Sequence, residues 1–507
     1  MSSETTASPL NIVFVHPDLG IGGAERLVID AAVGLQALGH RVTILTSYRN
    51  KEHCFEEARD GTLDVRVRGD ALFPASIGGR LSILFSILRQ LSLVASTGLA
   101  SGELRELDPD VFIVDQLSAC IPFFRLLYPK AKVLFYGHYP DRLLVKEEDG
   151  YRKYLKRLYR IPFDALEGWS TGCSDGIVVN SKYTRSIFRQ TFPSMRTRDL
   201  KVIYPCVDTN ETKNGFKDAA MWPDKKILLS INRFEGKKNL DLAIKAYANL
   251  STDERTRARL VVAGGFDPRN HENNITHKHL QDLSESLSLR HATFRSKDTA
   301  LTDLSNDNID LLFLLSIPHD LKQRLLHSAG LLIYTPRNEH FGIVPLEAML
   351  AGVPVLATNT GGPLETIYDG RTGWLRSPEK VEQWTDVMRK PLIPSSAETL
   401  RGMGQKGRER VLAEFSQTKM SRSFDQEVQR LVQSQTPRPS IVSTWMLLAI
   451  VVTIIAVIGG IVAMRFLTAE GGDQLAKAGK SVAANGTPVA NGAPVANGTP
   501  AAAKVEL

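Results

Sequence analysis

Cysteine is scarce in this sequence, which has 4 cysteines in 507 residues. The cysteines lie far apart, and none of them stands in a C-x-x-C pair. This spacing argues against a disulfide scaffold and against a structural zinc site, and it favours a reducing compartment. The positions are Cys54, Cys120, Cys173 and Cys206.

The sequence also lacks a compact arginine-rich arm and a zinc-finger pattern. Its formal net charge is +7, and the excess positive charge is spread along the chain. Such a diffuse charge suits anionic phosphates or lipid headgroups, and we expect no nucleic-acid partner.

No signal peptide is recognisable in the first residues, MSSETTASPLNIVFVHPD. They contain no basic segment, and the apolar run in them is too short for secretion. We therefore expect the folded part of the chain to stay in the cytosol.

The sequence is 43% hydrophobic, and its length predicts two or three domains. Short apolar runs alternate with helical sequence in two successive series. This alternation predicts two doubly wound α/β domains with a cleft between them, which we place at 1–206 and 207–435. The expected strands are 11–16, 41–46, 111–115, 132–136 and 177–180 in the first series, and 227–231, 260–263, 309–315, 331–334 and 353–357 in the second.

The segment 331–357, LLIYTPRNEHFGIVPLEAMLAGVPVLA, predicts a strand, a loop, a helix over 343–350 and a second strand. Glu339 lies in the loop, and Glu347 follows eight residues later in the helix. Gly342 lets the backbone approach a ligand at the helix N-terminus, where unpaired N–H groups and the helix dipole favour an anion. A nucleotide sugar suits this spacing, with Glu339 on the sugar and Glu347 on the ribose, although isolated helix glutamates are usually only solvated.

A glycine-rich turn follows the first strand, with Gly20, Gly22 and Gly23 leading into a helix over 24–38. Strand, glycine loop and helix form a phosphate-binding arrangement. A dehydrogenase would use the same arrangement. However, the next strand ends in Thr46-Ser47-Tyr48, which offers no acid to hold a ribose.

Basic residues follow the first strand of the second series. Arg233 and Lys238 are five residues apart on a loop that enters a helix, and they can converge on two phosphates, with Lys237 as the alternative lysine. Solvation of a surface loop is the competing interpretation. In the first series, His138 follows the strand 132–136, where open α/β sheets place their ligand sites. A lone histidine is more often structural.

Three further segments are candidates for contact with a membrane. The apolar segment 72–96 is interpreted first as a core helix and second as a helix in a membrane interface. The basic and tyrosine-rich segment 151–160 is either a solvated helix face or a contact with lipid headgroups. A transmembrane helix is expected within 441–466, because Trp445–Met464 is 20 residues without a charge, about 30 Å of helix. The low-complexity tail 467–507 is expected to be disordered.

Several of these motifs together resemble the retaining glycosyltransferases of the GT-B fold, which have two facing Rossmann-like domains. The resemblance is strongest to the mannosyltransferases of glycosyltransferase family 4, and it covers about 11–415. Glu339 and Glu347 match the family's E-x7-E motif, and Arg233 with Lys238 matches its R-x4-K motif. The segment FYGHYPD and the loop GGAER match two further motifs, although a glycine replaces the family's usual cysteine in the first.

The resemblance implies roles for individual residues. His138 would contact the transferred sugar, and Gly361 and Gly362 would flank the diphosphate. Gly22 and Gly23 would allow close approach to the reacting phosphate and sugar. The catalytic residues would be His138, Glu339, Arg233 and Lys238, with Lys237, Gly342, Glu347, Gly361 and Gly362 on the donor and Gly20, Gly22 and Gly23 on the acceptor side.

Within this family the sequence most resembles the mannosyltransferases of the dolichol pathway. That resemblance implies transfer of mannose from GDP-mannose to dolichol-diphosphate-linked Man1GlcNAc2, first by an α-1,3 and then by an α-1,6 link. The reaction would need no metal or other cofactor and would occur on the cytosolic face of the endoplasmic reticulum membrane, with other mannosyltransferases of the pathway as candidate partners. The alternatives are another membrane-associated GT-B glycosyltransferase, a sugar-nucleotide epimerase and an inactive partner subunit.

Overall fold

The computed structural model describes residues 8–70, 72–74, 76, 81–144, 151–209, 221–222, 224–295, 308–435, 437–438 and 440. The transmembrane helix expected within 441–466 and the tail 467–507 lie outside the described residues.

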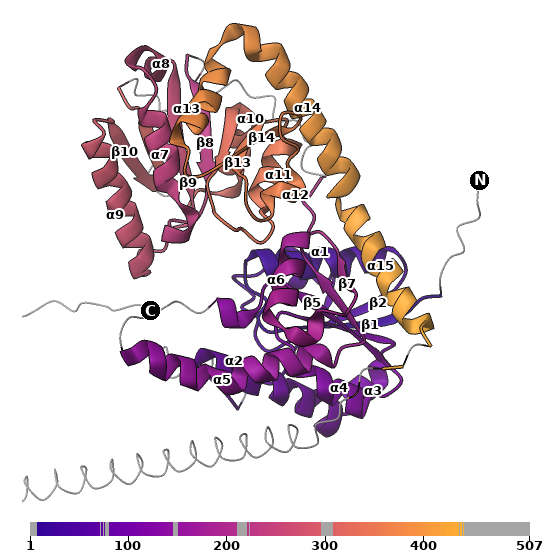
Figure 1. Ribbon diagram of the computed structural model, residues 1–507. Coiled ribbons are helices and arrows are strands. Elements are labelled where there is room, and N and C mark those ends of the chain that lie inside the picture. The colour runs from indigo at the N-terminus through magenta and orange to yellow at the C-terminus, as the bar shows by residue number, and fades with distance from the viewer. Residues whose placement is uncertain are drawn as a thin grey trace, which may run out of the picture. The chain divides into compact units, whose positions relative to one another are not determined.

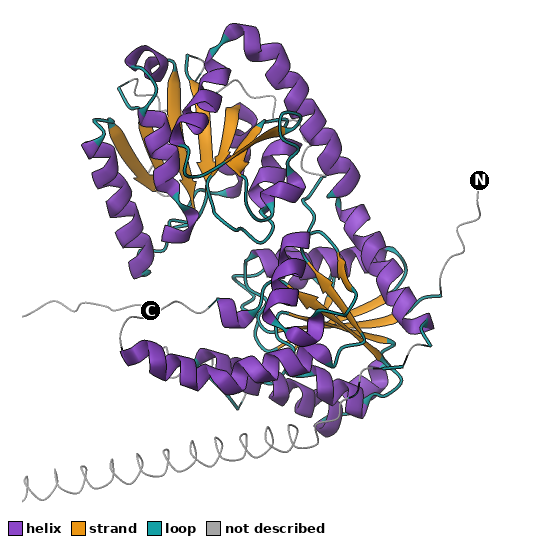
Figure 2. Ribbon diagram, in the orientation of Figure 1, coloured by secondary structure: helices purple, strands orange, loops and turns teal. Residues whose placement is uncertain are grey.

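Two seven-stranded sheets form the framework, each with helices packed on both of its faces (Figure 1, Figure 2). The strand orders are β3-β2-β1-β4-β5-β6-β7 and β10-β11-β9-β8-β12-β13-β14, and neighbouring strands pair in parallel. Both sheets are thus doubly wound, as the alternating pattern predicted. The strands are β1 Asn11–His16, β2 Arg41–Thr46, β3 Asp64–Val67, β4 Val111–Asp115, β5 Lys132–Gly137, β6 Gly176–Val179, β7 Leu200–Val202, β8 Lys226–Ile231, β9 Ala258–Gly264, β10 His291–Arg295, β11 Leu311–Leu315, β12 Ala329–Tyr334, β13 Val355–Thr358 and β14 Gly373–Arg376.

Every strand expected from the sequence is present, and its ends move by at most two residues. The sequence analysis missed β3, β7, β10 and β14, the outermost strands of the two sheets. Edge strands are covered on fewer sides, so their sequences need no continuous apolar run. In β10, for example, every residue is only partly buried or exposed.

Each sheet separates two hydrophobic cores, because alternate side chains of a strand point to opposite faces. Ile12 and Phe14 of β1 pack on one side with the helix that follows β1, while Val13 and Val15 pack on the other. Leu228 and Leu229 of β8 divide between two cores in the same way. This two-sided burial explains why the central strands are apolar throughout.

The last helix of the described chain, α15, packs against α1 and therefore against the first sheet (Figure 1). Gly34 of α1 permits this close approach, because a Cβ atom there would lie 1.7 Å from Ser421 Oγ. The range 207–435 thus builds the second sheet and then returns to the first.

The helices are α1 Gly23–Ala37, α2 Ser82–Ala95, α3 Glu103–Leu107, α4 Ile121–Leu127, α5 Tyr151–Gly172, α6 Lys182–Thr191, α7 Leu240–Ala248, α8 Thr252–Thr256, α9 His271–Ser286, α10 His319–Ser328, α11 Ile343–Leu350, α12 Pro363–Thr366, α13 Val381–Arg389, α14 Ala397–Glu414 and α15 Gln417–Gln433.

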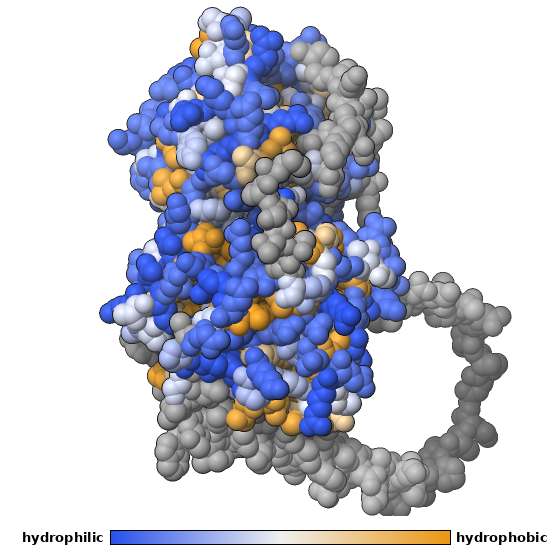
Figure 3. All heavy atoms as spheres, turned by 90° about the vertical axis from the view of Figure 1, so that its right-hand side faces the viewer, coloured by the Kyte–Doolittle hydropathy of each residue, from blue (hydrophilic) through white to orange (hydrophobic). Residues whose placement is uncertain are grey.

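One described helix, Ser82–Ala100, is apolar and long enough to cross a membrane, with a mean hydropathy of 1.5. Half of its apolar window is buried inside the fold, and core helices share these properties. Leu99, near its end, is 66% exposed. The face in Figure 3 is mainly hydrophilic and carries separate small apolar areas. Because burial in the core explains these properties of the helix equally well, contact of 72–96 with a membrane stays a prediction.

Candidate active site

Three polar side chains meet at the carboxyl ends of adjacent strands in the first sheet. His16 ends β1, Asp115 ends β4, and His138 lies just beyond β5, and these strands are neighbours in the order β1-β4-β5. His16 Nδ1 and His138 Nε2 donate hydrogen bonds of 2.7 and 2.8 Å to the two carboxylate oxygens of Asp115. His138 is therefore held by a buried carboxylate at the edge where ligands bind in such sheets.

Asp115 and His16 are each only 1% exposed. Burial alone would raise the pKa of Asp115, but the charge and hydrogen bond of His138 and the hydrogen bond of His16 outweigh it and lower that pKa to about 2. Burial alone would lower the pKa of His16, but the hydrogen bond and charge of Asp115 raise it. His16 Nε2 is buried without a hydrogen-bond partner, 4.0 Å from Glu25 Oε1 in the first turn of α1. The group thus places an ionised carboxylate between two imidazole rings.

The glycine-rich turn leads into α1 as predicted. Gly22 is the residue before the helix, and no side chain caps the helix N-terminus there. A Cβ atom at Gly23 would meet no atom within 4 Å, and one at Gly20 would meet only Asp18 Oδ1, at 3.9 Å. The space beside Gly20 and Gly23 is therefore open, whereas a Cβ atom at Gly22 would lie 2.2 Å from Glu25 Oε2. Gly22 and Gly23 line a cavity.

In the second domain, Lys238 and Glu339 form an ion pair with 2.5 Å between Nζ and Oε2. Lys238 ends the 3-10 turn Gly236–Lys238, and Glu339 lies in the loop between β12 and α11. Their side chains are 12% and 21% exposed. Burial alone would raise the pKa of Glu339, but the charge and hydrogen bond of Lys238 lower it below its usual value. At neutral pH this site therefore holds an ionised pair.

Arg233 and Lys237 have a different partner from Lys238. Arg233 Nη1 lies 3.0 Å from Glu235 Oε1, and Lys237 Nζ lies 3.1 Å from Glu235 Oε2. Both basic side chains are largely exposed, at 62% and 66%. Of the two neighbouring lysines, Lys238 is the one that reaches Glu339, and the predicted clamp of Arg233 and Lys238 on a diphosphate stays a prediction. Glu235 has no role in the sequence analysis.

The predicted donor-side glycines shape the loop that carries Glu339. Gly361 has φ +68°, and a Cβ atom there would lie 2.5 Å from the carbonyl oxygen of Glu339. The N–H of Gly362 donates a 2.7 Å hydrogen bond to that same oxygen. Gly342 has φ +90° and directly precedes α11, whose N-terminus has no side-chain cap. These contacts explain the glycines without a ligand, so their contact with a diphosphate stays a prediction.

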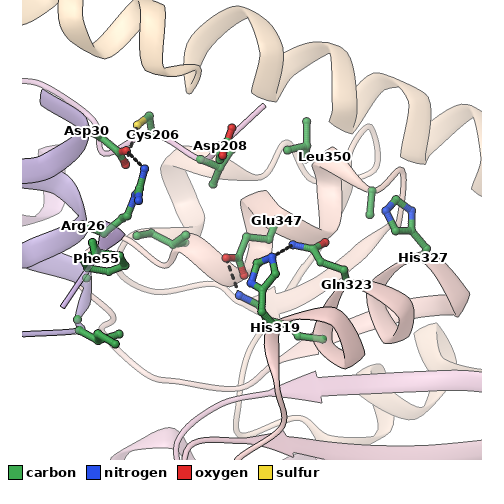
Figure 4. Close-up of a pocket in the computed structure, with 17 residues that line it drawn as sticks. Arg26, Asp30, Phe55, Cys206, Asp208, His319, Gln323, His327, Glu347 and Leu350 are labelled. Atoms are coloured by element: carbon green, nitrogen blue, oxygen red, sulfur yellow. Dashed lines mark hydrogen bonds and ion pairs between the residues drawn. The ribbon is translucent and has the colours of Figure 1, made fainter. Parts of the chain in front are cut away.

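A cavity of about 600 Å³ is lined by residues that precede and follow the expected domain boundary (Figure 4). Gly22 lines it from the glycine-rich turn, Gly23 and Arg26 line it from α1, and Glu347 lines it from α11. Glu347 Oε1 accepts a 2.7 Å hydrogen bond from Lys322 Nζ of α10, while Glu347 Oε2 is buried without a partner. The cavity thus joins the glycine loop of the first sheet to the second acid of the E-x7-E motif.

Within the described ranges, no group of three or more His, Cys, Asp or Glu side chains is placed to hold a metal ion. All four cysteines are unpaired, which agrees with the expectation of no disulfide scaffold.

Four site residues escaped the sequence analysis. His16 and Asp115 end predicted strands, so the rule that ligands bind at the carboxyl ends of parallel strands could have found them. Glu235 lies between Arg233 and Lys238, and an acidic side chain among these basic residues could have indicated an ion pair with one of them. Nothing in the sequence pairs Lys322 with Glu347, because their contact depends on how α10 packs beside α11.

Family models match the two halves of the chain separately. Residues 21–211 match the model described as Glycosyltransferase Family 4, and residues 213–410 match the model described as Glycosyl transferases group 1. Together the two models cover almost all of the residues that build the two sheets.

Curated relatives match over most of their length. The α-1,3/1,6-mannosyltransferase alg-2 of Neurospora crassa is 49% identical over 89% of this chain and 96% of that protein. The α-1,3/1,6-mannosyltransferase alg2 of Schizosaccharomyces pombe is 46% identical over 86% of this chain and 84% of that protein.

Solved structures share the fold. The sucrose-phosphate synthase of Thermosynechococcus elongatus aligns with a TM-score of 0.62 at 17% identity, over 83% of this chain and 98% of that one. A glycosyltransferase from Rickettsia africae aligns with a TM-score of 0.59 at 17% identity, over 85% and 100% of the two chains. The expected GT-B arrangement of two Rossmann-like domains is confirmed.

Proposed function

Because the chain belongs to the α-1,3/1,6-mannosyltransferase family, we propose that it transfers mannose from GDP-mannose to dolichol-diphosphate-linked Man1GlcNAc2. The α-1,3 link forms first and the α-1,6 link second. The products keep the anomeric configuration of the donor.

The observation that carries this proposal is the Lys238–Glu339 ion pair, which lies just before the uncapped N-terminus of α11. A departing GDP develops negative charge as its bond to the sugar breaks. Lys238, Arg233 and the N–H groups at the start of α11 can each stabilise that charge. In this proposal the positive charge comes from the protein, so the reaction needs no metal ion.

The two acids of the E-x7-E motif have separate roles in the proposal. Glu347 Oε2 is a buried acceptor without a donor, beside a cavity of about 600 Å³. Ribose hydroxyls are donors that would satisfy it. Glu339 is held by Lys238 and contacts the mannose, where it aligns the reacting carbon.

On the other side of the reacting sugar, His138 contacts the mannose from the first domain. Asp115 fixes the orientation of its ring through the 2.8 Å hydrogen bond to Nε2. The bond between the mannose C1 and the β-phosphate oxygen breaks, and the acceptor hydroxyl bonds to C1 from the same face. Its proton passes to the departing phosphate oxygen, which conserves charge without a carboxylate nucleophile.

We further propose that the enzyme acts on the cytosolic face of the endoplasmic reticulum membrane. The lipid-linked acceptor supports this location, as does the apolar segment Trp445–Met464 of the sequence.

The direct test is to incubate the purified full-length protein with labelled GDP-mannose and a Man1GlcNAc2-diphosphate linked to a dolichol-like lipid. We expect products with one and then two added mannoses, in buffer with or without EDTA. Digestion with linkage-specific mannosidases should identify the α-1,3 and α-1,6 bonds. Transfer to this acceptor would exclude both an epimerase and an inactive subunit. Conversion of GDP-mannose without transfer would indicate an epimerase, and the absence of any reaction would refute the proposal.

A further inference from the structure

The residues that directly follow the two proposed sugar-contacting groups stack on each other. Tyr139 follows His138 in the first domain, and His340 follows Glu339 in the second. The ring centroids of Tyr139 and His340 are 3.8 Å apart, and the ring planes are 12° from parallel. A single aromatic contact thus joins the two loops that carry His138 and Glu339.

The backbone of His340 is fixed by the first domain as well. Ser181, the residue before α6, donates a 2.6 Å hydrogen bond from its hydroxyl to the carbonyl oxygen of His340. The same hydroxyl accepts a 2.9 Å hydrogen bond from the N–H of Thr184 and so caps α6. The position of the His340 backbone is therefore tied to a helix of the opposite sheet.

A carboxylate strengthens this connection near the same helix end. Glu365 of α12 accepts hydrogen bonds of 2.8 and 2.7 Å from the N–H groups of Lys182 and Tyr183, the first residues of α6. Its Oε2 also accepts a 3.0 Å hydrogen bond from the hydroxyl of Tyr204. Charged acceptors at a helix N-terminus are favourable, so the contact resists separation of the two loops.

The His340 ring is neutral in this environment. Burial lowers its pKa to about 4, and the positive charges of Lys238 and Lys237 and the nearby His138 contribute, against the opposing effect of Glu339. A neutral ring can stack on Tyr139 without adding charge between the Lys238–Glu339 ion pair and His138.

We propose that the stacked pair of Tyr139 and His340 is a positioning contact that sets His138 against Glu339 across the transferred mannose. The inference rests on the proposed mannosyl transfer and assigns these two residues to it. Neither ring takes or gives a proton. Their removal leaves the donor contacts of the second domain intact but lets the two sugar-contacting loops move apart.

The expected result is a loss in kcat with little change in KM for GDP-mannose. A displacement of about 1 Å in a catalytic group can cost on the order of 100-fold in rate. We expect Tyr139→Ala and His340→Ala each to lower kcat by 10- to 100-fold on this basis. Because each change breaks the same contact, the double variant should be about as slow as either single variant.

Rescue by other aromatic rings distinguishes stacking from chemistry. Tyr139→Phe and His340→Phe keep a planar ring and should retain about half or more of the wild-type kcat, by the same geometric argument. His279→Ala is the matched control. His279 also lies in the second domain, but it is on α9 and contacts Asp241 of α7. That control should leave kcat unchanged. Thermal unfolding and a titration with GDP verify that each variant folds and binds the donor.

Two results would overturn the inference. If His340→Phe is as slow as His340→Ala, the imidazole itself acts in the reaction. If both alanine variants keep wild-type kcat, or if their losses multiply in the double variant, the stack does not position the two loops. A wild-type protein that transfers no mannose would instead refute the proposed function, so the two failures are distinguishable.

Discussion

At the residue scale, the two lysines of the loop after β8 make different contacts. Lys238 is 12% exposed and bonded to Glu339, whereas Lys237 is 66% exposed and turned toward Glu235. We expect Lys238→Ala to lower kcat by about 1000-fold, because a preorganised charge on the leaving group is lost. Lys237→Ala should cost no more than about tenfold, since its charge is exposed and screened. Initial rates with GDP-mannose in the presence of EDTA measure both.

Equal losses in the two lysine variants would contradict a specific role for Lys238. Normal activity in both variants would remove the phosphate clamp from the mechanism altogether.

Asp115 contributes a second specific contact at this scale. One oxygen of its carboxylate accepts from His16 and the other from His138. An amide in the same place would replace one of these oxygens with an NH2 group, which cannot accept a hydrogen bond. Asp115→Asn should therefore release one ring and lower kcat by about 100-fold while donor affinity stays unchanged. Rate measurements check the loss in kcat, and a titration with GDP checks the donor affinity. An unchanged kcat would show that the orientation of His138 does not depend on this bond.

At the element scale, the loop between β12 and α11 depends on a glycine in the neighbouring loop. Gly361 has φ +68°, and its missing Cβ leaves room for the backbone of Glu339. Gly370 has a similar φ of +73°, but a Cβ atom there would meet nothing within 4 Å. Gly370→Ala thus isolates the backbone strain, about 1–2 kcal/mol, and Gly361→Ala adds a steric clash.

We expect Gly361→Ala to lower the thermal unfolding midpoint more than Gly370→Ala and, alone of the two, to weaken GDP binding. Unfolding scans and titration with GDP provide the measurements. If the two variants behave alike, the close packing of Gly361 against Glu339 has no energetic consequence.

Helix α9 holds a partly buried histidine beside aromatic rings, which predicts a pH dependence of stability. His277 lies 5.6, 5.7 and 5.3 Å from the rings of Phe234, Phe266 and Phe313. Burial lowers its pKa to about 4, with smaller contributions from Arg295, His291 and Lys278. The unfolded chain takes up this proton near pH 6.5 and the folded chain only near pH 4, so acidification between those values favours unfolding.

The free energy of unfolding should therefore fall as the pH is lowered from 6.5 to about 4. His277→Gln, which does not titrate in this range, should show a smaller decrease. Urea denaturation at several pH values gives the slope of the unfolding free energy against pH for the wild-type protein and for His277→Gln. The same slope in both proteins would mean that His277 is already protonated in the folded state or does not contribute.

At the scale of the whole molecule, the orientation in the membrane is the open prediction. We expect the catalytic part to face the cytosol and the segment Trp445–Met464 to carry the end of the chain into the lumen. Protease added to sealed microsomes should then digest the catalytic part and spare a tag at Leu507. Asn210, Asn249 and Asn274 begin N-x-S/T sequons in the part expected to stay cytosolic, and these three should carry no glycan. A protected catalytic part with a digested tag would reverse the orientation.

The sequence determined much of the fold because its signals are local. A central parallel strand is buried on both faces, so it must be apolar over its whole length, and each such run was recognised. The helix Ile343–Leu350 was predicted with its observed ends, because a glycine precedes it and its apolar residues continue to the last turn. Motif spacing likewise identifies Lys238, Glu339 and Glu347 as candidate site residues from the sequence.

The tertiary structure alone decided which of these pieces meet. Asp115 lies 99 residues from His16 in the sequence, and Ser181 lies 159 residues from His340. Contacts between such distant residues leave no periodic pattern, because they depend on strand order and on the packing of one loop against another. The stack of Tyr139 on His340, the cap of Glu365 on α6 and the return of α15 to the first sheet are all of this kind. The sequence thus determined the strands and the chemistry carried at their ends, while folding determined which ends face each other.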